Sequence, residues 1–247
     1  MKIAALIPAR LESSRFPGKL LHKIGSKSII RHVHDNMIAS KLFDHVGVVC
    51  NHSDIYSEIT DNGGVAYMSQ NEHDNGTARI SEIAKTLDFP IIFNVQGDEP
   101  FVQSSILKSL IDIFKADVSE KIDIVSPMTP IIDETQIANP NVVKVVTTSN
   151  GEALYFSRSP IPYQRNLQSK RNCFRHIGIY GYRAAALKKI ELLPESNLED
   201  QEMIECLRYL EYGMKIKMAI TESQGVSIDT PEDLEKAIKY YQQLQSK

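Results

Sequence analysis

The sequence predicts an α/β protein with a mostly parallel sheet that helices cover on both faces. Its 247 residues, 42% of them hydrophobic, are enough to bury a full core. Along the first half, short apolar runs that suit buried strands alternate with helical patterns, and such alternation is typical of parallel sheets. The runs are Ile3–Ile7, Val46–Cys50, Val65–Met68, Ile91–Val95 and Ile122–Val125.

Two helices of the first half are predicted from apolar residues that recur every three or four positions. In the segment Ala78–Leu87 this stripe consists of Ile80, Ile83, Ala84 and Leu87. The second stripe consists of Ile106, Leu107, Leu110, Ile111 and Phe114. Each stripe would bury one face of a surface helix. In sheets of this type ligands bind beyond the carboxyl ends of the strands, so the loops after Ile7 and Val95 are the first places to look for chemistry.

The second half predicts a β-rich region followed by helices. Ser149-Asn150-Gly151 is a turn signal between two strand-like runs, Val142–Thr148 and Glu152–Phe156, which predicts a hairpin. The next elements are expected to be a strand at 174–182, a helix at about 183–193, a helix at about 201–212 and a strand at 215–221. Thr230 and Pro231 suit the cap and first turn of a last helix. No repeat or linker divides the chain, so we expect a single domain, 1–247.

Composition excludes several classes of partner and site. The formal charge of −3 gives no general attraction to nucleic acid or to an anionic membrane, so we expect neither as a partner. Cys50, Cys173 and Cys206 are odd in number and widely spaced, which argues against disulfides and a structural zinc site. No apolar segment approaches the roughly 20 residues that span a bilayer, and the N-terminal run is too short for a signal peptide. These observations favour the cytoplasm.

The loop after the first predicted strand combines features that suit a triphosphate. Residues 8–19 read P-A-R-L-E-S-S-R-F-P-G-K and contain three cations, two hydroxyls and one glycine. Arginine can bind phosphate oxygens through two N–H groups, lysine acts as a point charge, and small residues let backbone N–H groups approach an anion. Neither the P-loop nor the dinucleotide fingerprint is present. An ordinary solvated loop is the alternative, and the position after the first strand disfavours it.

Two carboxylates are candidates for holding a metal ion. Asp98 follows the apolar run Ile91–Val95, and Asp229 follows Val226-Ser227-Ile228. Magnesium takes one or two carboxylates, substrate phosphate oxygens and several waters, so a pair of this kind suits it. Either aspartate alone could equally be a helix cap or a turn residue.

Six motifs give the chain a resemblance to a known family. They are P-A-R-L-E-S-S-R-F-P-G-K at 8–19, N-G-T-A-R at 75–79, N-V-Q-G-D-E-P at 94–100, Y-F-S-R at 155–158, R-H-I-G-I-Y-G-Y-R at 175–183 and D-T-P-E-D at 229–233. In this order and spacing they closely resemble the 3-deoxy-manno-octulosonate (KDO) cytidylyltransferases, also called CMP-KDO synthetases. The resemblance covers nearly the whole chain.

The resemblance implies a Rossmann-like nucleotide-diphospho-sugar transferase fold, in which a β-rich insertion at about 135–185 serves sugar binding and dimerisation. It implies that CTP and the acidic sugar KDO are the substrates, that Mg²⁺ is required, and that the enzyme is a homodimer. The anomeric hydroxyl of the sugar would attack the α-phosphorus of CTP, and pyrophosphate would leave. The product, CMP-KDO, would feed lipopolysaccharide synthesis.

Site residues are implied by matching the motifs position by position. The residues expected to contact CTP are Arg10, Ser13, Ser14, Lys19, Asn75, Gly76, Thr77, Arg79 and Gln96. The residues expected to face the sugar are Arg15, Gln96, Arg158, His176, Tyr180, Tyr182 and Glu205, with Arg158 as the choice for the sugar carboxylate. Asp98 and Asp229 would hold magnesium, and with Arg10 and Lys19 they would stabilise the transition state. Tyr180 and Tyr182 could equally be strand residues that pack in a core or a dimer interface.

Three departures from the family pattern leave the exact sugar open. The chain reads Asn51-His52-Ser53-Asp54 where an Ala-Thr-Asp run is common, Ala78 replaces an acidic residue before Arg79, and Cys206 replaces the glutamine that commonly follows Glu205. An amino-substituted KDO or sialic acid therefore remains an alternative substrate. A non-catalytic sugar-nucleotide binder is a rival from another class, and the missing G-x-G-x-x-G makes a dinucleotide-dependent oxidoreductase remote.

Overall fold

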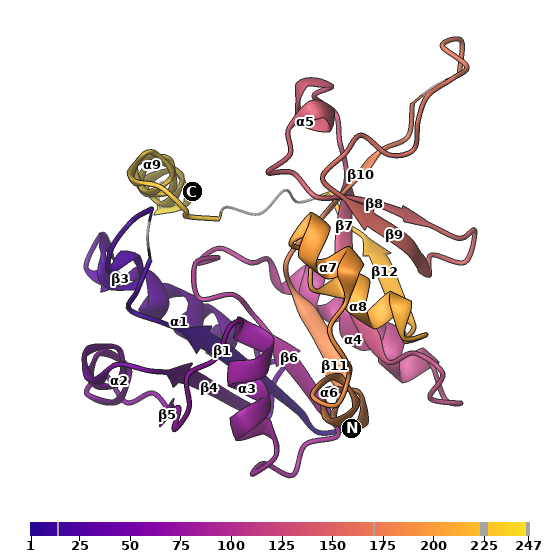
Figure 1. Ribbon diagram of the computed structural model, residues 1–247. Helices are drawn as coiled ribbons and strands as arrows, with labels where there is room; N and C mark the ends of the chain where they lie inside the picture. Colours follow the sequence, from indigo (N-terminus) through magenta and orange to yellow (C-terminus); the bar gives the residue numbers. More distant parts are fainter. Residues whose placement is uncertain (14, 170, 223–226, 246–247) are drawn as a thin grey trace. The chain divides into compact units, whose positions relative to one another are not determined.

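The computed structural model describes residues 1–13, 15–169, 171–222 and 227–245 (Figure 1). The chain divides into two compact units. Unit 1 consists of Met1–Ser104 together with Gly225–Lys247, and unit 2 consists of Ser105–Gln224. The single-domain expectation stays a prediction, and each unit is described by itself below.

Unit 1 is built on a parallel sheet, as the alternation of apolar runs predicts. Its strands lie in the order β5 (Ala66–Met68), β4 (His45–Cys50), β1 (Ile3–Ala9) and β6 (Ile91–Asn94). Every pair is parallel, and the centre of β1 pairs Ala5 with Val46 on one side and with Phe93 on the other. All seven residues of β1 and all four of β6 are buried, which is why both read as continuous apolar runs.

Three helices, α1 (Ile29–Ser40), α2 (Ser53–Thr60) and α3 (Gly76–Ala84), pack against this sheet. In α1 and α3 a side-chain cap fixes where the helix begins. The hydroxyl of Ser28 caps α1 by accepting the Arg31 amide. Asn75 caps α3 by accepting the Ala78 amide at 2.8 Å, so α3 begins two residues before the predicted start at Ala78. It ends at Ala84 rather than Leu87.

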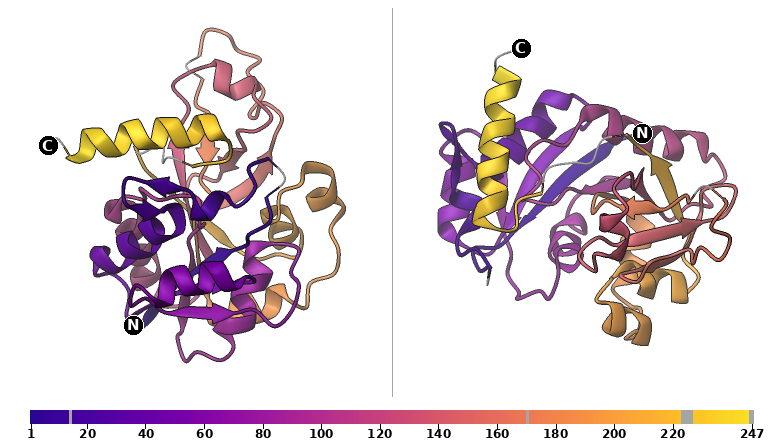
Figure 2. Two further views of the ribbon diagram at one scale, coloured as in Figure 1. Left: turned by 90° about the vertical axis from the view of Figure 1, so that its left-hand side faces the viewer. Right: turned by 90° about the horizontal axis from the view of Figure 1, so that it is seen from above.

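The remaining elements of unit 1 are a one-turn 3-10 helix (Lys19–Leu21), the small hairpin of β2 (Lys23–Ile24) and β3 (Lys27–Ser28), and α9 (Pro231–Gln245). Figure 2 shows α9 as one long helix, and it packs beside β2. Tyr241 of α9 lies against His32 and Phe101. The predicted start of α9 is confirmed, because Thr230 and Asp233 cap each other reciprocally.

Unit 2 is richer in antiparallel pairing than unit 1. The strands run in the order β11 (Tyr180–Arg183), β7 (Ile124–Pro130), β10 (Phe174–His176), β8 (Lys144–Thr147) and β9 (Ala153–Ser157), with β12 (Ile216–Ile220) parallel to β7. The predicted hairpin is confirmed as β8 and β9, with Gly151 at φ 77° in its turn. The helices are α4 (Ser104–Ala116), α5 (Thr135–Ala138), α6 (Ala184–Ile190), α7 (Asn197–Glu202) and α8 (Cys206–Glu211).

Two predicted elements of unit 2 are wrong, because each is divided in two. The strand expected at 174–182 is β10 and β11, separated by a tight turn in which the Ile179 amide donates to the Ile177 carbonyl at 2.8 Å. The helix expected at about 201–212 is α7 and α8. Met203 ends α7 in the left-handed backbone region at φ 52°, which breaks the helical path.

The three cysteines are buried and unpaired, as their spacing predicts. Across the parts of the chain that the structure describes, no helix combines the length and the apolar character that crossing a membrane requires.

Candidate active site

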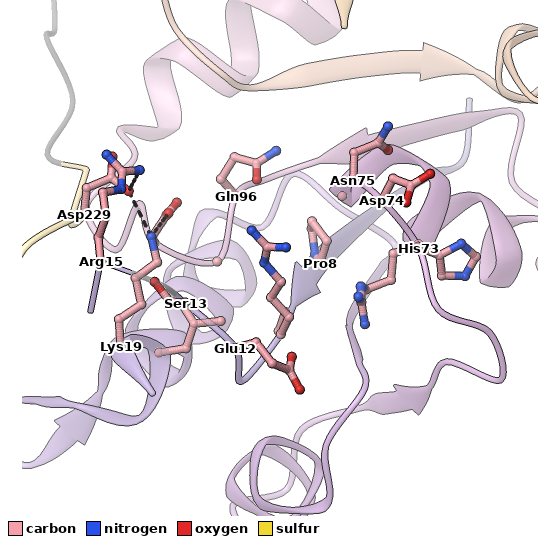
Figure 3. Close-up of a pocket in the computed structure, with 17 residues that line it drawn as sticks. Pro8, Glu12, Ser13, Arg15, Lys19, His73, Asp74, Asn75, Gln96 and Asp229 are labelled. Carbon is pink, nitrogen blue, oxygen red and sulfur yellow. Dashed lines mark hydrogen bonds and ion pairs between the residues drawn. The ribbon is translucent and has the colours of Figure 1, made fainter. Parts of the chain in front are cut away.

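A pocket of about 400 Å³ lies in unit 1 beyond the carboxyl ends of β1 and β6 (Figure 3). This is the edge at which open α/β sheets bind their ligands. The pocket is lined by Pro8, Ala9, Arg10, Glu12, Ser13, Arg15, Lys19, Leu20, His73, Asp74, Asn75, Gly76, Arg79, Gln96, Gly97, Asp98 and Asp229. Cations from the N-terminal loop therefore share one cavity with both predicted metal ligands.

Lys19 joins the two predicted metal ligands. Its Nζ atom lies 2.6 Å from Asp98 Oδ2 and 3.1 Å from Asp229 Oδ1, and it also donates to the Ile228 carbonyl. Burial opposes the charge of Lys19, but the two carboxylates outweigh it and raise the pKa of the ammonium group. The two carboxylates thus converge on one point of positive charge, although they lie 131 positions apart in the sequence.

Asp229 is free for this contact because it is not the cap of α9. Its carboxylate binds Lys19 and, at 3.0 Å, the Nη2 atom of Arg15 (Figure 3). The capping role falls to Thr230 and Asp233. Of the two explanations that the sequence leaves open for Asp229, the helix cap is therefore excluded.

Arg79 brings a buried and unsatisfied positive charge to the pocket. The residue is only 5% exposed, and its Nη1 atom has no hydrogen-bond partner among the described residues. Burial and the nearby charge of Arg10 both lower the pKa of Arg79. A buried donor without a partner is costly, so this nitrogen is suited to an oxygen of a bound ligand.

Two glycines let the backbone come close to the first strand. A Cβ atom on Gly97 would lie 3.0 Å from the Pro8 carbonyl oxygen, and one on Gly76 would lie 3.0 Å from Pro8 Cγ. Side chains at these positions would push apart the segments that form the floor of the pocket. The helix α3 also begins at Gly76, so the positive end of its dipole faces the pocket.

A carboxylate outside the predicted set orders the loop before α3. Glu82 accepts from His73 at 2.5 Å, from the Ser69 hydroxyl at 2.9 Å and from the Gln70 amide at 2.7 Å. Burial opposes its ionisation, but these donors outweigh burial and lower the pKa of Glu82 to about 2. The helical spacing of α3 gives no hint of this role, because its partners come from the preceding loop.

Asn51, the first residue of the atypical run after β4, supports the N-terminal loop. Its amide nitrogen donates to Glu12 at 2.8 Å, and its carbonyl oxygen accepts the Leu11 amide at 3.3 Å. The Asn51 contact also lowers the pKa of Glu12. One side chain thus fixes two consecutive residues of the loop that lines the pocket.

Unit 2 contains a separate pocket, and several of the predicted sugar-contacting residues line it. The lining consists of Asn141, Val143, Arg175, His176, Gly178, Tyr180, Met203, Ile204 and Glu205. His176 and Tyr180 come from β10 and β11, which lie on either side of β7, and their rings lie 5.4 Å apart. Arg175 also lines this pocket and brings a positive charge to it, although its sequence motif predicted no such role.

The buried side of this second pocket is polar. Ser126 contacts the Nε2 atom of His176 at 2.9 Å, and the thiol of Cys206 lies 3.3 Å from the Tyr180 hydroxyl. Burial, aided by the charge of Arg175, lowers the pKa of His176 to about 3. Burial also raises the pKa of Cys206 to about 12, so both side chains are neutral near pH 7.

Arg158 and Tyr182 lie outside the lining of the second pocket. The guanidinium of Arg158 donates to three backbone carbonyls, those of Glu202 at 2.6 Å, Pro140 at 2.9 Å and Met203 at 3.2 Å. A guanidinium has five N–H groups, so these contacts with described residues leave two for another partner. Tyr182 is fully buried beside Tyr180, with 5.8 Å between the ring centroids. The expected contacts of Arg158 and Tyr182 with the sugar stay predictions.

The structure brings most of the predicted CTP and metal residues into the pocket of unit 1. Those found in its lining are Arg10, Ser13, Lys19, Asn75, Gly76, Arg79, Gln96, Asp98 and Asp229, together with Arg15 from the sugar set. Thr77 is buried and accepts from Asn94 instead. Ser14 lies outside the described residues.

Comparison with known proteins identifies the family. The sequence profile of the cytidylyltransferases matches residues 4–216. The 3-deoxy-manno-octulosonate cytidylyltransferase of Christiangramia forsetii is 47% identical over 96% of this chain and 96% of its own length. The chain belongs to the 3-deoxy-manno-octulosonate cytidylyltransferase family. The family member from Flavobacterium johnsoniae is 48% identical over 96% of this chain and 97% of its own.

Solved structures agree with this family assignment. A CMP:2-keto-3-deoxy-manno-octonic acid synthetase in complex with CTP superposes with a TM-score of 0.94 at 35% identity, and the match covers 98% of this chain and 99% of that one. A 4-diphosphocytidyl-2C-methyl-D-erythritol synthase from Anaerococcus prevotii shares the fold, with a TM-score of 0.65 at 16% identity. The Rossmann-like nucleotide-diphospho-sugar transferase fold implied by the motifs is therefore confirmed, as a mixed sheet with a parallel core.

Proposed function

We propose that this chain transfers CMP from CTP to 3-deoxy-manno-octulosonate and releases pyrophosphate, which supplies CMP-KDO for lipopolysaccharide synthesis. The observation that carries the proposal is the convergence of Asp98 and Asp229 on Lys19 in a pocket that Arg10 and Arg79 also line. Near-complete coverage of family members that are 47% and 48% identical supports it.

The pocket of unit 1 is proposed to hold CTP. Arg10, Ser13 and Lys19 would contact the phosphates, because they offer an arginine fork, a hydroxyl and a point charge on one loop. Asn75, Gly76, Arg79 and Gln96 would contact the cytidine. The Nη1 atom of Arg79, which has no hydrogen-bond partner among the described residues, would donate to one oxygen of the cytidine. Ser14 and Thr77 are assigned from the motif match alone.

Asp98 and Asp229 fit a divalent cation because their oxygens already converge on the Nζ atom of Lys19. Two carboxylates match magnesium, which completes its shell with phosphate oxygens and water. When bound, Mg²⁺ would polarise phosphate oxygens and neutralise charge that develops on them. No three His, Cys, Asp or Glu side chains within the described ranges form a metal cluster, so a site that needs substrate oxygens is the better match.

The sugar is proposed to contact Arg15, Gln96, Arg158, His176, Tyr180, Tyr182 and Glu205. His176, Tyr180 and Glu205 have the strongest support, because they share the lining of the unit 2 pocket. The side chains of this chain need not supply a nucleophile, because the anomeric hydroxyl of the sugar attacks the α-phosphorus itself. Arg10 and Lys19 would stabilise the negative charge that grows on the phosphates as pyrophosphate leaves.

The test is pyrophosphate release by the purified protein with CTP and Mg²⁺, comparing KDO, 8-amino-KDO, sialic acid and no sugar. We expect release with KDO, its loss when EDTA removes the metal, and its return when Mg²⁺ is added. Faster turnover of 8-amino-KDO would show that the departures at Ala78 and Cys206 change the preferred sugar. Silence with every sugar would contradict the proposal and favour a non-catalytic binder of sugar nucleotides.

We also propose that the enzyme is a homodimer, which the motif resemblance implies. The test is the mass in solution, measured by light scattering after size-exclusion chromatography. A mass near twice the 27.8 kDa of the chain is expected, and a monomer at every concentration tried would contradict it.

A further inference from the structure

We propose that Ser126 is a positioning residue that fixes His176 as the tautomer with its proton on Nε2. His176 would then meet the ligand of the unit 2 pocket with a bare Nδ1, which accepts a hydrogen bond from a sugar hydroxyl. The second part of this inference rests on the proposed function, and the first part does not.

The hydroxyl group of Ser126 makes three contacts. The Oγ atom of Ser126 lies 2.9 Å from His176 Nε2, 2.8 Å from the Ile179 carbonyl oxygen and 3.2 Å from the Ile177 carbonyl oxygen. Ser126 lies on β7 and has no exposed surface. Water therefore does not compete for the hydroxyl, and its three neighbours decide where its proton goes.

The two carbonyl oxygens can only accept, and the hydroxyl has one proton. If that proton pointed to the histidine, Oγ would face two carbonyl oxygens at 2.8 and 3.2 Å with no hydrogen between them. If it points to Ile179 instead, the buried carbonyl gains a donor and the Oγ lone pair accepts from the ring. The second arrangement satisfies every group, so His176 must donate through Nε2.

The carbonyl of Ile177 already has a donor, because it accepts the Ile179 amide at 2.8 Å. The carbonyl of Ile179 therefore has the greater need of the hydroxyl. The same turn separates β10 from β11. Because the predicted strand is interrupted here, the carbonyls of Ile177 and Ile179 are available to orient the hydroxyl of Ser126. A continuous strand would have paired both carbonyls with a neighbouring strand.

The ring of His176 is also held from the sides. Phe156 packs edge-on against it with centroids 4.9 Å apart, and Tyr180 lies at 5.4 Å. With Nε2 bonded to Ser126, no described residue makes a hydrogen bond to Nδ1. His176 is part of the pocket lining. Nδ1 is thus the ring nitrogen left to contact a ligand.

The charge state of the ring is consistent with this role. Burial lowers the pKa of His176 to about 3, so the ring is neutral near pH 7 and Nδ1 has no proton. The titratable and charged groups around the ring are Arg175, Tyr180 and Glu205 from the pocket lining and Cys206 behind Tyr180. A ring that only accepts at Nδ1 would select a hydroxyl donor and would not attract an anion. The carboxylate of an acidic sugar must then be bound elsewhere.

The experiment is nitrogen-15 NMR of the imidazole rings in the intact protein, with the His176 signals assigned by their loss in His176→Gln. We expect the neutral ring with its proton on Nε2 in the wild type and in Ser126→Thr, which keeps the hydroxyl. In Ser126→Ala we expect a mixture of tautomers, and the KM for KDO should rise about tenfold, as for one lost hydrogen bond. The KM for CTP should stay within a factor of two.

A wild-type ring with its proton on Nδ1, or a doubly protonated ring at pH 7, would overturn the proposal. So would a Ser126→Ala variant with an unchanged tautomer and an unchanged KM for KDO. The NMR measurement needs neither sugar nor turnover, so it stands even if the protein proves inactive toward KDO. Inactivity toward KDO with the expected tautomer would contradict the proposed function and leave the role of Ser126 intact.

Discussion

At the scale of single residues, the pocket of unit 1 depends on the carboxylates of Asp98 and Asp229. The Asp98 carboxylate accepts a hydrogen bond from Lys19, and Asp229 is not needed as the cap of α9 because its neighbour Thr230 takes that role. Lys19 contacts one oxygen of each carboxylate, Oδ2 of Asp98 and Oδ1 of Asp229, so among the described residues the second oxygen of each can bind a metal ion. Substitution of either one removes charge and changes little volume.

We expect Asp98→Asn to lower kcat by a factor on the order of 10²–10³, the usual effect of removing a group that stabilises transition-state charge. The melting temperature should stay close to that of the wild type, because asparagine keeps the size of the side chain. The matched control is Asp88→Asn, which changes an exposed aspartate of the same unit. Near-normal turnover by a folded Asp98→Asn variant would contradict the metal assignment. Pyrophosphate release and thermal unfolding provide the two readouts.

At the scale of elements, both pockets depend on charged side chains that bind neighbouring loops. Glu82 on α3 holds the loop that carries His73 and Ser69. Arg158, at the end of β9, holds the carbonyls of Pro140 and Met203, each next to a residue that lines the unit 2 pocket. Lys144 strengthens this second set by donating to the carbonyls of Asn139 and Arg158.

We expect Glu82→Gln to lower the melting temperature at pH 7 because the amide cannot match the ionised carboxylate as an acceptor for three donors. The folded pKa of Glu82 is lowered to about 2, below the ordinary value of 4.5 for a glutamate, so its contribution to stability is full above pH 4.5. The contribution is lost as the pH falls from 4.5 to 2. The difference in melting temperature between wild type and variant should therefore shrink over that window. A difference that stays constant down to pH 2 would contradict the role of the charge.

We expect Arg158→Ala to lower the melting temperature and to raise the KM for KDO more than the KM for CTP. Three backbone carbonyls lose their donor, and a loss of about 1 kcal/mol shifts the melting temperature of a chain of this size by roughly 2–4 °C. The control is Lys188→Ala, which removes an exposed cation from α6. Equal changes in both KM values would contradict a specific role in the sugar site. Thermal unfolding and initial-rate kinetics give the two measurements.

At the scale of the whole molecule, the residues assigned to the two substrates divide between the two units. The residues assigned to CTP and metal lie in unit 1, and those with the best-supported sugar contacts lie in unit 2. The segments proposed to contact CTP and the metal ion come from four separate stretches of the chain, at 8–19, 73–79, 96–98 and 229. Binding of one substrate should therefore be detectable by itself.

We expect CTP with Mg²⁺, in the absence of sugar, to slow hydrogen exchange in peptides that contain residues 8–19, 73–79 and 96–98. The reason is that bound phosphate occupies backbone N–H groups and orders the loops that present them. Peptides that cover residues 141–143 and 175–178 should be protected less under these conditions. The control is a sample that contains Mg²⁺ but no CTP. Protection confined to unit 2 would contradict the assignment of the nucleotide pocket.

The sequence by itself determined the parallel sheet of unit 1, the hairpin of unit 2 and the family. Each of these depends on local patterns: apolar runs such as Ile91–Val95, the turn at Asn150-Gly151 and motifs that stay contiguous along the chain. Local patterns survive folding because neighbours in sequence stay neighbours in space. The cap at Thr230 was predicted for the same reason.

Only the tertiary structure decided which distant groups meet. Three sets of contacts join residues that are far apart in sequence. They are the convergence of Asp98 and Asp229 on Lys19, the hydrogen bonds from Arg158 to backbone carbonyls, and the contact between Ser126 and His176. The breaks at Met203 and between β10 and β11 also come from packing and backbone conformation that apolar periodicity does not encode. The binding partner, charge and tautomer of a side chain depend on its neighbours in space. Those contacts form only when the chain folds.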